Sequence, residues 1–248
     1  MSPTDRVRID TLLVGLVAIA LLGCASQAPV KRDPRDPLER MNRVTYTVND
    51  KLDRAIAKPV AKTYRRVTPH FVQRGVSNFM DNLHYPVVLA NDILQLKWKA
   101  SLNDVGRLVL NTAFGIGGLF DPASDAGLMK NDEDFGLTLG HWGVHPGPYL
   151  VIPVLGPSDF RDGFGKLADG FADPANYISN SAVRYGLYGV YLIDRRARLL
   201  DVESALDNAY DPYALLRNVF LQHRQYRITG ESESPNPLED ELPDPDAK

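Results

Sequence analysis

The sequence predicts a mostly α-helical protein with little or no β-structure, folded as one compact domain. Three observations support this fold class. Pairs such as Asp-Pro and Thr-Pro, which typically start helices, recur along the chain. Apolar residues follow them at three- and four-residue spacing, as on one face of a helix. No strand pattern alternates with these segments, and no internal repeat is visible.

The first helices follow from such starts. Asp36-Pro37-Leu38-Glu39 predicts a helix capped by Asp36. Its apolar face is Leu38, Met41, Thr45, Val48, Leu52 and Ile56, and Pro59 interrupts or kinks it. Thr68-Pro69 opens a second helix and Pro86 is expected to begin a third. A fourth helix is expected over residues 102–113, ended by Gly115, Gly117 and Gly118.

The second half contains shorter elements. Helices are expected after Asp121-Pro122, around residues 133–139, over 157–171 with Ser158 as a capping residue, over 180–206 and over 212–228. Residues 145–148 are a predicted turn. Residues 149–155 are compatible with a short buried strand, although Pro153 disfavours a central position in a sheet.

A glycine-rich apolar block lies in the middle of the chain. Of the 19 glycines, 11 fall between Gly115 and Gly165, interleaved with aromatic and aliphatic residues. Glycine permits positive φ and proline fixes φ, so this composition predicts tight turns packed against other elements. We expect this block to form an irregular, tightly turned centre of the molecule, with the helices before and after it as a frame. Seven of its apolar residues have core packing as their simplest role when taken singly: Phe114, Ile116, Leu119, Phe120, Val151, Ile152 and Leu155.

The N-terminus is typical of an exported lipoprotein. Arg6 and Arg8 precede an apolar run over residues 11–22, too short to span a bilayer, which ends in Leu21-Leu22-Gly23-Cys24. This is the pattern of a bacterial lipobox, and Cys24 is the single cysteine. We expect a signal peptide over 1–23, lipidation of Cys24 and a tether over 24–35. A chance cysteine after an uncleaved anchor is the alternative. Because Ala25 rather than Asp follows, the expected destination is the outer membrane, in its periplasmic leaflet.

Charge separates the domain from the C-terminal tail. The formal net charge is −3, and residues 230–248 carry seven acidic residues and one lysine. Such a Pro-rich acidic segment is predicted to be disordered, which leaves residues 36–229 as the domain. Basic clusters lie at residues 58–66 and 195–198. Solvated faces explain them most simply, with lipid phosphates as the alternative; the exported compartment and weak net charge exclude nucleic acid.

The motifs of common enzymes are missing from the sequence. There is no Gly-x-Ser-x-Gly elbow and no Walker loop, so neither an α/β-hydrolase nor a nucleotide-driven function is supported. His141 and His145 have helical spacing, but Gly143 and Pro146 break the helix that would align them on a metal. No cofactor or metal is predicted.

Several motifs together resemble the MlaA (VacJ) family of phospholipid-binding lipoproteins. They are Asp36-Pro37-Leu38-Glu39, Asn42-Arg43, Ser77-Asn78-Phe79, Asn82-Leu83, the run TLGHWGVHPGPYLVIPVLGPSDFRD and Asp211-Pro212-Tyr213. The resemblance covers about residues 36–230. Met41 departs from it, because an aromatic residue is usual there.

The resemblance implies a ring-like helical domain around a central amphipathic channel, held in the outer membrane beside a trimeric porin. It implies removal of phospholipid mislocalised in the outer leaflet and transfer to a soluble periplasmic carrier. The candidate channel residues are Phe114, Gly115, Ile116, Gly117, Gly118, Leu119, Trp142, Tyr149, Pro153, Gly156, Asp159 and Arg161.

Two other hypotheses stay open on the sequence. One is a membrane-tethered phospholipase or envelope hydrolase, which would need an essential polar residue such as His141 or Asp159. The other is a lipoprotein that only braces porins and binds no lipid.

Overall fold

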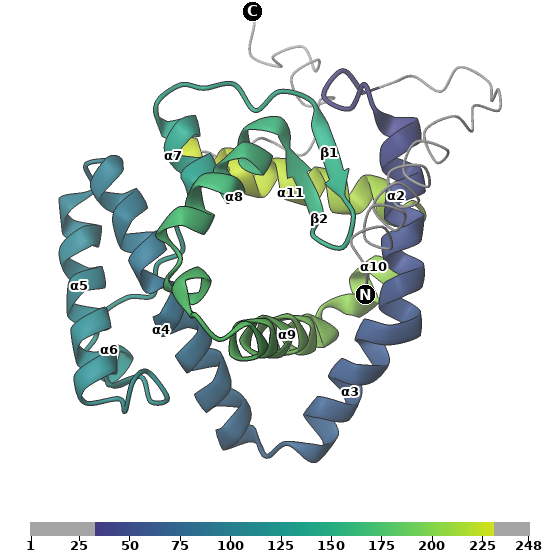
Figure 1. Cartoon of the computed structure of the whole chain (residues 1–248). Coiled ribbons are helices and arrows are strands. Elements are labelled where there is room, and N and C mark those ends of the chain that lie inside the picture. Colours follow the sequence, from purple (N-terminus) through teal and green to yellow (C-terminus); the bar gives the residue numbers. More distant parts are fainter. Residues whose placement is uncertain (1–32, 231–248) are drawn as a thin grey trace, which may run out of the picture.

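The computed structural model describes residues 33–230, and Figure 1 shows the order of its elements. The mostly helical class is confirmed, with a single two-stranded hairpin in the described part of the chain. The elements are α2 (Glu39–Leu52), η1 (Asp53–Ala57), α3 (Lys58–Val67), α4 (His70–Leu94), α5 (Trp98–Ala113), α6 (Pro122–Asp125), α7 (Phe135–His141), β1 (Tyr149–Ile152), β2 (Gly156–Asp159), α8 (Phe160–Ala172), η2 (Pro174–Tyr177), α9 (Ser181–Arg198), η3 (Leu199–Asp201), α10 (Glu203–Asp207) and α11 (Pro212–Thr229). The expected signal peptide, Cys24, the tether as far as residue 32 and nearly all of the acidic tail lie outside the described residues.

The long helices form an angular frame. In Figure 1, α2 and α3 form one arm, α4 forms the other, and the two arms meet in a V at the bottom of the view. Helix α5 packs against α4, while α9 lies inside the V and contacts both α3 and α4. The hairpin, α7, α8 and α11 occupy the opposite side. In this view the ribbons follow one another around a gap.

The junction between α2 and α3 is a change of helical winding and not a break. Residues Asp53–Ala57 form a π-helical turn, and Pro59 is the second residue of α3. The predicted interruption at Pro59 is therefore a π-turn in a continuous helical rod.

Pro86 lies inside α4 and does not begin a helix, contrary to the sequence prediction. It removes one backbone donor, but Tyr85, Val87 and Val88 beside it are buried. Burial of these three apolar side chains stabilises the continuous 25-residue helix by more than the lost hydrogen bond costs. Helix α5 also begins earlier than expected, at Trp98.

The strand considered for residues 149–155 exists as the first half of a hairpin. Strand β1 pairs antiparallel with β2, with Tyr149 opposite Asp159, and Pro153 falls in the turn between them. Residues 157–159 are consequently strand, and α8 begins at Phe160. The capping residue is Asp159, whose carboxylate accepts from the N–H of Asp162, so the prediction of Ser158 as the cap is wrong.

Asp36 also differs from its predicted role. Helix α2 begins at Glu39, and the buried carboxylate of Asp36 instead accepts hydrogen bonds from Asn42, Tyr213 and Arg217. These contacts attach the start of the domain to α11; Asp36 and Tyr213 are 177 residues apart in the sequence. They adjoin the cluster formed by Tyr149, Val151 and Tyr213, with Tyr46, Phe220 and Leu221 packed around it. A buried carboxylate with three donors is better satisfied there than at an exposed helix start.

The segment predicted as one long helix over 180–206 is divided. Asn180 caps α9, which ends at Arg198, and η3 and α10 follow. The guanidinium of Arg196 binds both Asp53 and Glu203, so the chain turns back after α9 to bring Glu203 to it. Asp211 caps α11 as predicted, and Gly230 ends it in a left-handed conformation.

Candidate functional site

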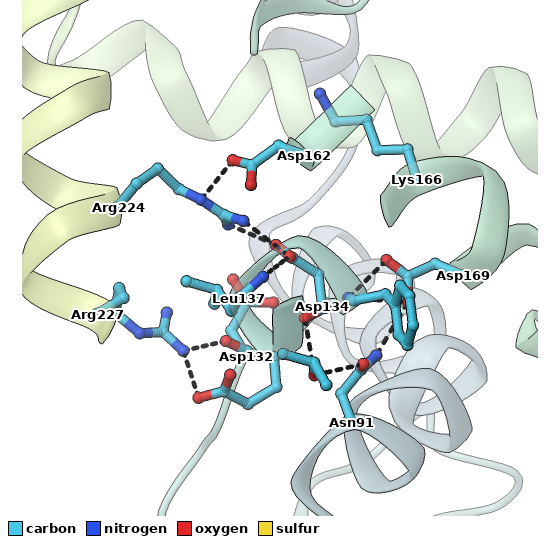
Figure 2. Close-up of polar contacts among 12 residues, drawn as sticks. Asn91, Asp132, Asp134, Leu137, Asp162, Lys166, Asp169, Arg224 and Arg227 are labelled. Carbon is cyan, nitrogen blue, oxygen red and sulfur yellow. Dashed lines mark hydrogen bonds and ion pairs between the residues drawn. The ribbon is translucent and has the colours of Figure 1, made fainter. Parts of the chain in front are cut away.

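A network of buried charges joins the elements on the side opposite the V. Arg224 on α11 forms ion pairs with Asp134, which caps α7, and with Asp162 on α8 (Figure 2). Asp169 on α8 accepts from the N–H of Phe135 and from Asn91 on α4. Figure 2 shows these side chains converging from α4, α8, α11 and the start of α7. Each carboxylate in this network is held by an arginine, an amide or a backbone N–H from another part of the fold, so the network ties these elements together.

The start of α8 belongs to the same network. Arg161 lies 3.5 Å from Asp159 and 3.2 Å from Asp162, and all three side chains are buried. Burial and the charge of Asp162 raise the pKa of Asp159 to about 6, against the opposing effect of its hydrogen bond from the Asp162 N–H. Ser158 is fully buried; its hydroxyl accepts from Lys166 Nζ at 3.1 Å and donates to the carbonyl of Asp159. This environment suits support of the hairpin better than attack on a substrate.

A tight turn after α5 presents apolar side chains to the outside. Ile116, Gly117 and Gly118 all have positive φ, of 53°, 67° and 96°. A Cβ on Gly115 would lie 2.4 Å from the carbonyl oxygens of Asn111 and Phe120, so that position admits only glycine. The turn packs on α4 through Gly118, where a Cβ would meet the side chain of Asn82 at 2.5 Å.

One buried ion pair fixes the far side of this turn. Arg107, which is 1% exposed, donates two hydrogen bonds of 2.8 Å to Asp121, and Asn111 donates a third. Burial acts to raise the pKa of Asp121, but hydrogen bonds from Ser124, Asn111 and Arg107 outweigh it and lower the pKa to about 2. Asp121 therefore stays charged and closes the turn.

Exposed apolar stripes run along several helices. On α8, four large side chains spaced four, three and four residues apart share one face and are more than half exposed: Phe160, Phe164, Leu167 and Phe171. On α5, a similar stripe consists of Trp98, Leu102, Val105 and Val109. Leaving such side chains in water forgoes roughly 1.5–3 kcal/mol each, so surfaces of this kind are typical of contact with lipid or another protein. Within residues 33–230, no helix is both long enough and apolar enough to cross a bilayer.

Comparison with known proteins decides the family. The MlaA lipoprotein family model matches residues 34–227. The chain belongs to the MlaA lipoprotein family. The intermembrane phospholipid transport system lipoprotein MlaA of Escherichia coli K12 is 35% identical, over 98% of this chain and all of that protein. The protein of the same name from Haemophilus influenzae is 31% identical, over 90% of this chain and 92% of the Haemophilus protein.

A solved structure supports the same assignment. It was described as the structural basis for maintenance of bacterial outer membrane lipid asymmetry, and it matches with a TM-score of 0.71 at 35% identity. The match covers 80% of this chain and all of that one. This MlaA-family chain therefore shares both sequence and helical fold with its relatives over nearly the whole described domain.

The candidate channel residues fall into two groups in this MlaA-family fold. The turn after α5 holds Phe114, Gly115, Ile116, Gly117, Gly118 and Leu119, and it lies against α4. The hairpin region holds Trp142, Tyr149, Pro153, Gly156, Asp159 and Arg161, and its strands lie against α2, α8 and α11. The two groups thus belong to separate parts of the fold.

Exposure separates the candidates further. Five candidates are exposed: Phe114, Ile116, Leu119, Trp142 and Pro153. For Phe114, Ile116 and Leu119 this differs from the core packing expected of each residue singly. Tyr149, Asp159 and Arg161 are buried and hold the hairpin and α8 in place. The indole of Trp142 also donates to the carbonyl of Leu94, which ties α7 to the end of α4.

Sequence reasoning missed the residues that position the site. Arg107 and Arg224 drew no functional interpretation, and Asn82 and Asp162 were noted only as parts of the motifs that resemble the family. Asp121 was identified only as a helix start. The charges of residues such as Arg107 and Arg224 at otherwise core-facing helical positions were the available signal, since buried charges require partners.

Proposed function

We propose that this protein is the lipoprotein of an intermembrane phospholipid transport system and that it helps to maintain outer-membrane lipid asymmetry. In this proposal it removes mislocalised phospholipid from the outer leaflet. Membership of the MlaA lipoprotein family along residues 34–227 carries the proposal. The names of the Escherichia coli and Haemophilus influenzae relatives and the subject of the matching structure support it.

Passage of a phospholipid past this protein needs no bond to be broken. Moving the charged headgroup through hydrocarbon costs several kcal/mol or more, and a path with polar and apolar walls lowers that barrier. In this proposal the exposed candidates Phe114, Ile116, Leu119, Trp142 and Pro153 contact the lipid. Direction would come from tighter binding downstream, because the chain has no Walker loop.

The membrane context completes the proposal. Lipid on Cys24 would anchor the chain in the periplasmic leaflet, and the exposed stripes on α5 and α8 would meet acyl chains or a trimeric porin. A soluble periplasmic carrier would receive the lipid. The buried ion-pair network supports this arrangement, since it keeps the frame rigid while lipid moves past.

A genetic experiment tests the function. A strain lacking the chromosomal gene should accumulate phospholipid in the outer leaflet, measured as lipid cleaved by phospholipase added to whole cells. The wild-type gene should restore the low level, whereas Cys24→Ala should not. Unchanged outer-leaflet phospholipid in the deletion strain would refute the proposal.

A second measurement separates transport from hydrolysis. Phospholipid incubated with the purified lipoprotein should remain intact by mass spectrometry. Release of fatty acid that disappears in Asp159→Asn or His141→Ala, with unchanged thermal stability, would instead favour the tethered phospholipase.

A further inference from the structure

The corner where α3 meets α4 is unusually basic. Between Asp53 and Asp81 the chain contains six lysines and arginines and no acidic residue. Helix α3 ends at Val67, the chain turns through Thr68 and Pro69, and α4 begins at His70. Figure 1 shows this corner as the point of the V, at the edge of the molecule.

Three cations near the corner have no carboxylate partner in the described part of the chain. Lys58 pairs with Glu203 and Arg65 with Asp201, but Lys62, Arg66 and Arg74 form no ion pair within residues 33–230. By contrast, Arg107 and Arg224 elsewhere in that part are held by carboxylates.

This arrangement of charge is unfavourable within the chain itself. Lys62 and Arg66 are four residues apart on one helix, where like charges repel. Arg74 lies near the start of α4, whose first turn has no acidic residue and whose dipole disfavours a cation. An external anion would offset both effects.

Apolar side chains project between these cations. Val67 is 69% exposed and Phe71 is 73% exposed, and they flank the turn itself. An exposed aliphatic and aromatic tip surrounded by cations has the two properties of an interfacial anchor: apolar groups that enter the acyl region and charges that bind phosphate.

We propose that the α3–α4 corner docks on a membrane surface rich in anionic phospholipid headgroups. Val67 and Phe71 enter the interface, while Lys62, Arg66 and Arg74 bind the headgroup phosphates. An acidic protein surface would match the charges but would leave the apolar tip unexplained. The proposal rests on the membrane location in the proposed function and adds to it a lipid class and a contact point.

A site-specific fluorescent probe tests the docking. In the mature lipoprotein Cys24 is acylated and is the single native cysteine, so Val67→Cys supplies one free thiol for an environment-sensitive dye. The labelled lipoprotein is reconstituted into phosphatidylcholine vesicles with or without phosphatidylglycerol, and quenching by a lipid-borne quencher is measured. Tyr210→Cys, fully exposed between Asp207 and Asp211, is the control position.

The expected result is quenching at residue 67 that rises with phosphatidylglycerol, with none at residue 210. In the triple variant Lys62→Gln, Arg66→Gln, Arg74→Gln, the apparent affinity for phosphatidylglycerol should fall roughly tenfold or more. The matched triple variant Arg40→Gln, Lys51→Gln, Lys99→Gln removes the same charge from exposed positions without ion pairs in the described chain and should behave as wild type.

Three results would overturn the proposal: no quenching at residue 67, equal quenching without phosphatidylglycerol, or equal loss in both triple variants. If outer-leaflet phospholipid is still removed by the same protein in cells, only the corner is wrong. If the corner is quenched as expected but deletion of the gene leaves outer-leaflet phospholipid unchanged, the transport function is wrong instead.

Discussion

Arg107 on α5 and Asp121 at the start of α6 are joined by two hydrogen bonds of 2.8 Å, which close the turn that carries Phe114, Ile116 and Leu119. The same carboxylate caps α6 through the N–H of Ser124. The turn is thus shaped by a charge pair beneath it, while its apolar side chains are left facing outward. Polar residues hold the turn in shape, and its apolar residues remain exposed.

Removing one member of this pair should destabilise the protein strongly. Asp121→Ala leaves the buried guanidinium of Arg107 without its carboxylate and removes the α6 cap, so the free energy of unfolding should fall by about 3–5 kcal/mol. Denaturant titration measures this. Asp121→Asn retains a cap and should lose less; a loss below about 1 kcal/mol in Asp121→Ala would show that the pair does not hold the turn.

Two neighbouring glycines should respond differently to alanine. Gly115→Ala places a methyl group 2.4 Å from two carbonyl oxygens, which forces the backbone of the turn to move. Gly117→Ala meets no atom within 4 Å and carries only the strain of its left-handed φ, about 1–2 kcal/mol. Thermal unfolding should therefore show a clearly larger drop for Gly115→Ala. Equal effects would contradict the geometry of the turn.

Ile116 offers a test of stability against function. It is a β-branched residue at φ 53°, and its side chain is two-thirds exposed, so it gains little from packing within the chain. Ile116→Gly should raise the free energy of unfolding by about 1 kcal/mol and yet weaken lipid removal in cells.

Leu96→Gly is the matched control, because Leu96 is also left-handed and exposed but lies outside this turn, between α4 and α5. It should stabilise the protein and leave lipid removal unchanged. Full activity of Ile116→Gly in the outer-leaflet assay would show that the side chain of Ile116 has no role.

The buried carboxyl groups of Asp92 and Asp104 should make the stability of the protein depend on pH. Burial, followed by Asp104 and Glu133, raises the pKa of Asp92, and Lys97 opposes them; Asn131 donates to its carboxylate. Because the folded-state pKa lies above the unfolded value of about 3.9, the stabilisation from protonated Asp92 is complete below that value and declines as pH rises.

Asp92→Asn cannot ionise and isolates this effect. The stability of the wild type relative to Asp92→Asn should decrease steadily from about pH 4 towards neutrality. Unfolding free energies of both proteins measured across this range provide the check. A constant difference, or one that grows with pH, would contradict the buried-pair assignment.

The sequence predicted helices well where local chemistry sets them. Asp211 and Asn180 cap their helices because a side-chain oxygen next to an apolar stripe satisfies free N–H groups locally. Prediction from the sequence failed at Pro86 and Asp36, where contacts with distant residues outweigh the local preference. Tyr213, for instance, binds Asp36 across 177 positions in the sequence, and no local pattern reports such a contact.

The candidate site was predictable in composition but not in exposure. Glycine density predicted tight turns in this block, because positive φ has a signature in sequence, but the second strand of the hairpin was expected to be helix. Burial of Tyr149 and exposure of Phe114 depend on what packs against them, which a single sequence does not encode locally. Ser158 and Asp159 show the same limit, since either is a plausible cap and only the strand pairing assigns the role to Asp159.

The most direct test of the account is photocross-linking in living cells. A photoreactive phenylalanine analogue at position 114 should capture phospholipid, and mass spectrometry of the adduct should show both acyl chains intact. The same analogue at Tyr210, fully exposed between α10 and α11, should capture none. Absence of lipid at 114, or an adduct that has lost an acyl chain, would contradict passive passage of intact phospholipid along this turn.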